Sequence, residues 1–169
     1  GKYTILNNAI DTSKYKFNKK IRNEVRRNYR LTGKFVIGNV GKLNPPKNHI
    51  HLLRVFSEYS KMDQAGILVI AGGGELEQEL KVEAKRLNIA EKVLFLGMYD
   101  DISGILQAFD IFVFPSIFEG LGMAVIEAQA SGLHCIASDS IPLETKVTPY
   151  IEYLDLGLSE DIWAERIYE

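Results

Sequence analysis

The sequence of 169 residues contains one cysteine, Cys135, and no disulfide can therefore form within the chain. This excludes the disulfide-stabilised class of small secreted domains and favours a reducing compartment. Cys135 lies in the apolar run 134–137, which indicates a buried, inert thiol rather than a nucleophile. No apolar run approaches the length of a membrane span, and no signal peptide is recognisable. We therefore expect a soluble, cytoplasmic domain.

The chain also lacks an excess of charge of one sign, since it has 20 Lys and Arg residues and 22 Asp and Glu residues. The net charge of −2 gives no indication of a nucleic-acid partner, so any anion must be bound at a local site. The one basic stretch, 14–30, carries eight Lys and Arg residues against Glu24 alone. We interpret it as the solvated face of a helix. The alternative is a surface that faces an anionic membrane or a partner domain.

Short apolar runs alternate with amphipathic stretches from residue 35 onward. The expected strands are 35–40, 67–71, 93–96, 111–114, 135–137 and 150–154, and the expected helices between them are 48–61, 75–89, 101–109 and 122–131. The runs are continuously apolar, as strands buried on both faces require. The helix over 75–89 is expected to bury Leu76, Leu80, Val82 and Leu87.

This alternation predicts a single α/β domain over residues 1–169, with a Rossmann-like three-layer αβα arrangement. Its sheet should be parallel and doubly wound, with about six strands. In such sheets ligands bind outside the carboxyl ends of the strands, so the residues that follow each strand are the candidate site.

The segment from Phe112 to Ser138 is the most informative part of the sequence. A buried strand ends at Phe114, Glu119 follows in a loop, and Gly120-Leu121-Gly122 leads into a helix. Glycines at a helix start let backbone N–H groups approach a ligand, and the positive end of the helix dipole favours an anion. A phosphate group is the ligand that this element predicts.

Glu127 lies on the helix that follows, among apolar neighbours. A carboxylate there is costly unless it is hydrogen-bonded. Vicinal hydroxyls of a ribose could bind it, and so could a loop N–H group or a lysine. The spacing alone leaves these alternatives open.

Other candidate residues also have ordinary structural explanations. Lys42 and Lys47 follow the first strand, where they could bind phosphate or be plain loop lysines. Glycines 72–74 could form a phosphate loop, although three glycines after a strand more often make a tight turn. His49 and His51 are expected at the surface or as helix caps, and their spacing does not predict a metal site.

Glu119 and Glu127 stand in the frame P-S-x-x-E-G-x-G-x-x-x-x-E-A-x-A-x-G, which resembles the Glu-x7-Glu motif of retaining glycosyltransferases of family 4. The resemblance extends over nearly the whole chain. Further elements similar to those of the family are Asn8-Ala9-Ile10-Asp11, the loop 38–43 with Lys47-Asn48, the turn 70–74 and the run 93–97. The family has the GT-B fold, two Rossmann-like domains that face a cleft. The chain would be the C-terminal, nucleotide-sugar-binding half, without the N-terminal acceptor domain.

The resemblance implies a role for each matching residue. Glu119 would contact the donor sugar, Glu127 the ribose hydroxyls, and Lys42 and Lys47 the diphosphate. Backbone groups of Gly41, Leu121 and Gly122 would add to the diphosphate site, while Gly97, Met98 and Tyr99 would flank the base. The chain departs from the family at Lys42, where arginine is commoner, at the stiff loop 44–46, and at 132–135.

The resemblance further implies transfer of a sugar, with retention, from a UDP- or GDP-type donor to an acceptor in bacterial polysaccharide or glycolipid synthesis. We expect the whole protein to be the enzyme and this domain alone to be inactive. No Asp-x-Asp occurs in the sequence, so neither a metal nor another cofactor is expected. Expected partners are the donor, the N-terminal domain and the inner face of the cytoplasmic membrane. The alternatives are a nucleotide-sugar epimerase and a non-catalytic nucleotide-sugar-binding domain.

Overall fold

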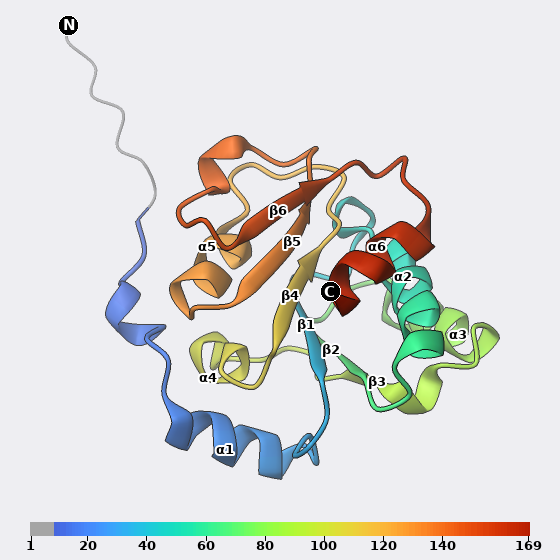
Figure 1. Ribbon diagram of the computed structural model, residues 1–169, viewed down its shortest axis with the longest axis horizontal. Helices are drawn as coiled ribbons and strands as arrows, with labels where there is room; N and C mark the ends of the chain where they lie inside the picture. Colours follow the sequence, from blue (N-terminus) through green and yellow to red (C-terminus); the bar gives the residue numbers. More distant parts are fainter. Residues whose placement is uncertain (1–8) are drawn as a thin grey trace, which may run out of the picture.

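The six runs predicted as strands all form strands of one parallel sheet, in the order β3-β2-β1-β4-β5-β6. A computed structural model describes residues 9–169 (Figure 1). The strands are β1 (Val36–Val40), β2 (Ile67–Ala71), β3 (Val93–Phe95), β4 (Ile111–Phe114), β5 (His134–Ser138) and β6 (Ile151–Leu154). The predicted parallel, doubly wound α/β fold is confirmed.

Helices cover both faces of the sheet and make two hydrophobic cores (Figure 1). On one face lie α2 (His49–Met62), α3 (Glu77–Arg86) and α6 (Glu160–Tyr168); on the other lie α1 (Lys19–Asn28), α4 (Ile102–Leu106) and α5 (Met123–Ala130). Successive residues of a strand point to opposite faces, so Ile37 enters the first core and Val36 the second. The central strands are therefore apolar at nearly every position, whereas β3, at the sheet edge, is only half-buried.

The structure corrects the predicted helices at the end of α4, which is at Leu106 and not at residue 109, and at the buried face of α3. Val82 is not buried with Leu80 but has 66% of its surface exposed. Leu80 and Ala84, four residues apart, form the buried stripe of α3, and a residue two positions after Leu80 projects to the far side of the helix. Cys135 is fully buried, and burial raises the pKa of its thiol to about 12, in agreement with an inert role.

The order of the strands places a topological switch point between β1 and β4, and the divide between the loops that follow these two strands is called the β1/β4 crevice below. These strands are neighbours, yet β1 leads to α2 on one face of the sheet and β4 leads to α5 on the other. The loops after them therefore diverge at the carboxyl edge. In doubly wound sheets this divergence is where ligands bind.

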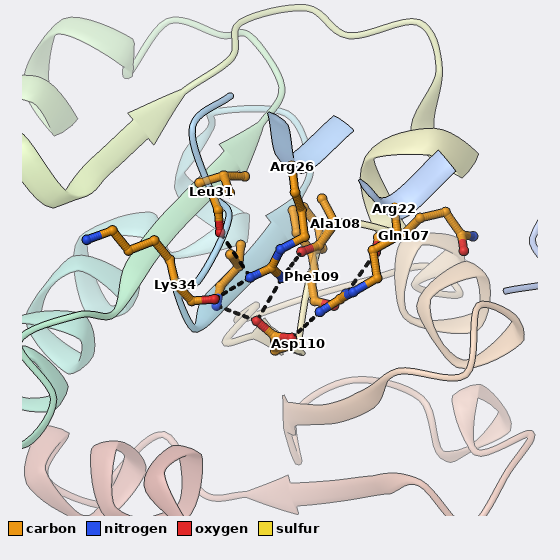
Figure 2. A network of polar contacts seen from close by, with 9 residues as sticks. Arg22, Arg26, Leu31, Lys34, Gln107, Ala108, Phe109 and Asp110 are labelled. Atoms are coloured by element: carbon orange, nitrogen blue, oxygen red, sulfur yellow. Dashed lines mark hydrogen bonds and ion pairs between the residues drawn. The ribbon is translucent and has the colours of Figure 1, made fainter. Parts of the chain in front are cut away.

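The basic stretch 14–30 is only in part the solvated helix face that was predicted. Arg22 and Arg26 on α1 both form ion pairs with Asp110, just before β4 (Figure 2). Arg26 also donates to the carbonyl of Ala108 at 2.8 Å, and the Asp110 carboxylate accepts the backbone N–H of Val36 at 2.7 Å. This network fastens α1 to the amino ends of β1 and β4.

One prediction extends beyond this description. Asn8, the first residue of the 8–11 element, lies outside the described residues. Within residues 9–169, no helix is both long enough and apolar enough to span a bilayer.

Candidate functional site

The loops after β1 and β2 pack against each other through their backbones. The N–H of Gly41 donates to the carbonyl of Ala71, and the N–H of Leu43 to that of Gly73, both at 3.0 Å. A Cβ atom on Gly72 would lie 1.9 Å from the Gly41 carbonyl oxygen, and the φ of Gly72 is +150°. The glycines of 72–74 are thus explained by close loop packing, which favours the tight-turn interpretation over a phosphate loop.

A hollow of about 420 Å³ opens at the carboxyl ends of β1, β2 and β3. Its lining includes Gly41, Lys42, Met98 and Tyr99, four residues that the sequence placed at the donor site, and it is completed by Val40, Ala71, Gly72, Gly73 and Ile102. The Met98 side chain is largely exposed at its edge. Burial raises the pKa of Tyr99 to about 12, with a smaller contribution from a hydrogen bond with Tyr29, so the Tyr99 hydroxyl stays protonated.

Two predicted charged residues meet across the β1/β4 crevice. Lys47, in the loop before α2, donates to Glu119, in the loop before α5, with 2.5 Å between Nζ and Oε1. Only 21% and 10% of the two side chains are exposed, and the ammonium also lies 4.9 Å from the centre of the Phe114 ring. The N–H of Ile117 donates to the carbonyl of Pro46 at 2.8 Å and joins the same two loops. The crevice therefore holds one cation and one anion in fixed positions.

The start of α5 has the geometry that the glycines indicated. Gly122 is its N-cap, with φ +71° and ψ +49°, and provides no side chain to bond the first N–H groups of the helix. The positive φ favours glycine, and a Cβ atom there would also make a tight contact of 3.2 Å with the Thr145 side chain. Leu121 precedes it in the same loop as Glu119. The amino end of α5 thus opens toward the crevice with its dipole positive.

Glu127 has a hydrogen-bond partner that the sequence did not indicate. The hydroxyl of Tyr15 donates to its Oε1 at 2.8 Å, in place of a loop N–H group or a lysine. Burial raises the pKa of Tyr15 to about 12, and this hydrogen bond makes a smaller contribution in the same direction. The two residues lie 112 positions apart, and no local pattern of the sequence indicates that they meet.

The prediction for the two histidines is wrong, because neither is a surface or capping residue. His49 has 1% of its surface exposed, and its Nε2 lies 3.0 Å from the amide oxygen of Asn39 on β1. Asn39 in turn donates to the carbonyl of Val113 on β4 at 2.8 Å. His51 is half-buried with its ring edge-on to Trp163. His49 therefore helps to join β1, β4 and the start of α2 beneath the crevice.

His49 should make stability depend on pH. Burial lowers its pKa to about 4, with a smaller contribution from the positive charge of Lys47, whereas a histidine in the unfolded chain has a pKa of about 6.5. As the pH falls through this window, the unfolded chain takes up a proton that the folded chain does not. The folded state should lose about 3 kcal/mol between these limits. In His49→Gln this part of the loss should be absent from urea titrations at pH 7 and pH 4.5.

The exposed His134 offers a matched control for that experiment. His134→Gln should follow the pH dependence of the wild type. Parallel stability curves for His49→Gln and the wild type would contradict the assignment.

Two other features of the described residues do not add to this site. No cluster of three or more His, Cys, Asp or Glu side chains within residues 9–169 could hold a metal ion. A second hollow, of about 350 Å³, is lined by residues of α1 and the following turn, among them Arg22, Arg26 and Gly33. It lies at the amino edge of the sheet, and the two arginines are already paired with Asp110.

Comparisons with known proteins agree on one family. The sequence model of the family described as "Glycosyl transferases group 1" matches residues 21–150. The chain is 38% identical over 135 residues to the putative glycosyltransferase EpsF of Bacillus subtilis, a match that covers 79% of this chain and 35% of that protein. It is 39% identical over 112 residues to UDP-Gal:alpha-D-GlcNAc-diphosphoundecaprenol alpha-1,3-galactosyltransferase of Escherichia coli, covering 62% of this chain and 28% of that protein.

A solved structure shows the same fold. Anabaena HepE, crystallised in complex with UDP and glucose, superposes with a TM-score of 0.85 at 21% identity, over 95% of this chain and 45% of that one. The chain spans about a third of the length of the two curated relatives. With its doubly wound sheet and the family match over residues 21–150, the chain belongs to the group 1 family of glycosyl transferases.

Proposed function

We propose that this chain is the donor-binding domain of a retaining glycosyltransferase of family 4 and that it binds a UDP-sugar. The observation that carries the proposal is the hollow at the carboxyl ends of β1, β2 and β3. Gly41 and Lys42 from one loop, and Met98 and Tyr99 from another, line the same hollow. These residues were singled out from separate sequence elements, and their convergence supports one binding site.

The charges around the crevice suit a nucleoside diphosphate as leaving group. When the anomeric C–O bond breaks, negative charge builds on the outer phosphate and positive character builds on the sugar ring. Lys42, Lys47 and the amino end of α5 would stabilise the phosphate, because preorganised cations and N–H groups act most strongly where charge develops. Glu119, held by Lys47, would accept hydrogen bonds from the sugar hydroxyls. No protein nucleophile is required by this arrangement.

The choice of UDP over GDP rests on the relatives. HepE was crystallised with UDP, and the name of the Escherichia coli relative gives UDP-galactose as its donor. A uracil would lie against Met98 and Tyr99, at the edge of the hollow. Backbone groups next to Gly97 would bond its polar edge.

The activity of the whole protein requires a second domain. The curated relatives are about three times as long as the matched region, which leaves room for an N-terminal domain that binds the acceptor. We propose a lipid-linked sugar as acceptor, as in the name of the Escherichia coli relative. The complete protein would then work at the cytoplasmic face of the membrane, in polysaccharide synthesis.

Calorimetric titration of the complete protein with UDP and GDP tests the donor assignment. We expect UDP to bind at least about tenfold more tightly than GDP, which corresponds to about 1.4 kcal/mol. Glu127→Ala should weaken UDP binding, and Glu58→Ala, at a partly exposed position of α2, should not. The anomeric configuration of the product, read by NMR, tests retention. A complete protein that binds neither nucleotide would exclude the proposed function.

A further inference from the structure

We propose that Tyr15 is a positioning residue of the donor site, which holds the Glu127 carboxylate in the orientation that receives the hydroxyls of the donor ribose. The inference rests on the proposed function, in which Glu127 binds the ribose. It adds a residue from the segment before α1, far in sequence from the loops that line the crevice.

The contact between Tyr15 and Glu127 meets the requirements of an orienting hydrogen bond. Glu127 is the one charged side chain of α5, whose other residues are Met, Ala, Val, Ile and Gln. Its carboxylate is half-buried, and its Oε1 accepts the Tyr15 hydroxyl at 2.8 Å. A carboxylate on an apolar helix needs such a donor to keep one orientation.

The position of Tyr15 is set independently of Glu127. Gln107, which is almost fully buried after α4, donates through its amide to the Tyr15 carbonyl at 3.1 Å and accepts the N–H of Asn18 at 2.8 Å. The same amide donates to the carbonyl of Ser103 at 3.3 Å. The Tyr15 ring packs against the hydrophobic core on this face of the sheet. The hydroxyl is therefore held in place from the backbone side and from the ring side.

The chemistry of a phenol suits this task better than that of a cation. The raised pKa of Tyr15 keeps its hydroxyl protonated, so it remains a donor at every working pH. It occupies one acceptor position on Oε1 and leaves Oε2 to accept hydrogen bonds from two vicinal hydroxyls. It also leaves the charge of the carboxylate intact, whereas a lysine at this place would neutralise it. Tyr15 thus fixes the carboxylate without competing for the ribose.

The test compares UDP with its 2′,3′-dideoxy analogue, using the complete protein. The wild type should prefer UDP, because only UDP offers the ribose hydroxyls to Glu127. In Tyr15→Phe, UDP binding should weaken by about threefold to tenfold while binding of the analogue is unchanged, because the loss of one hydrogen bond of ordinary strength has an effect of this size. In a Glu127→Ala background, Tyr15→Phe should have no further effect on UDP binding.

Tyr59→Phe is the matched control, because it also removes a tyrosine–carboxylate hydrogen bond. The Tyr59 hydroxyl donates to Asp63 at 3.0 Å at the far end of α2, away from the crevice. This variant should bind UDP and the analogue as the wild type does, and thermal melting of all variants will show any general loss of stability.

The outcomes separate the two proposals. A preference for UDP that is reduced by about threefold to tenfold in Tyr15→Phe supports the positioning role. A wild type that prefers UDP, together with a Tyr15→Phe variant that keeps the full preference, overturns the role and leaves the proposed function standing. A wild type that binds UDP and the analogue equally removes the ribose role of Glu127, and with it that of Tyr15. A wild type that binds no nucleoside diphosphate and transfers no sugar overturns both.

Discussion

Replacing Lys47 by alanine is expected to lower the kcat/KM of sugar transfer by the complete protein by about 10²- to 10³-fold. Lys47 belongs to the β1–α2 loop, and its ammonium is held by Glu119, from the loop before α5, and by the face of the Phe114 ring. A cation fixed in this way needs no reorganisation when negative charge develops on the leaving diphosphate. Removal of one preorganised donor of this kind costs about 3 kcal/mol in the transition state.

Loss of Lys47 also leaves Glu119 without its partner, so kinetics and stability must be measured together. Lys61→Ala is a matched control, since Lys61 pairs with Glu58 at the same distance of 2.5 Å on the exposed end of α2. It should keep the activity of the wild type. Lys47→Arg should recover part of the activity of Lys47→Ala, because it restores the charge with a different geometry. Activity of Lys47→Ala within twofold of the wild type would rule out its role at the diphosphate.

Asp110→Ala should lower the free energy of unfolding by about 3 kcal/mol or more. The Asp110 carboxylate pairs with Arg22 and Arg26 and accepts the N–H of Val36, and only 10% of the Arg26 side chain is exposed (Figure 2). The substitution therefore leaves the buried Arg26 guanidinium without a counter-ion, although it keeps its backbone carbonyl partners, and leaves the Val36 N–H without its acceptor. Such a loss costs more than the net stabilisation that the pair provided.

Urea titration of the domain in the complete protein, with Glu152→Ala as control, tests this expectation. Glu152 binds Arg166 through two hydrogen bonds of 3.0 Å, but on the surface, where solvent and salt screen the pair. Its loss should change the free energy of unfolding by less than about 1 kcal/mol. Equal effects of the two substitutions would mean that the α1 network is no stronger than a surface ion pair.

The fold was predictable from the sequence because its signals are local. Strands that are buried on both faces produce short apolar runs, such as 67–71 and 111–114, and each run stands between turn residues and an amphipathic stretch. Helix ends and faces were predicted less well. The end of α4 at Leu106 and the exposure of Val82 depend on how each helix meets the sheet.

The candidate site was predictable in its parts but not in its contacts. The glycines before α5 and the loop lysines can be found from local patterns in the sequence. The roles of Glu119 and Glu127 come from the family resemblance of their motif, and those roles stay predictions. His49 was misjudged because a histidine at a helix start usually faces solvent. Here Asn39, ten positions earlier on β1, offers it a buried partner, and no local pattern indicates that the two side chains meet.

The six strands, the helices between them and the loops that carry the candidate residues are local features of the sequence, since each depends on a window of a few residues. Which of those loops meet depends on the packing of the whole fold. The crossover that sets β4 beside β1 brings Lys47 to Glu119 across 72 residues, and the path of the first segment brings Tyr15 to Glu127 across 112. Such pairs follow from strand order and layer packing, which are properties of the whole chain and leave no trace in the spacing of residues.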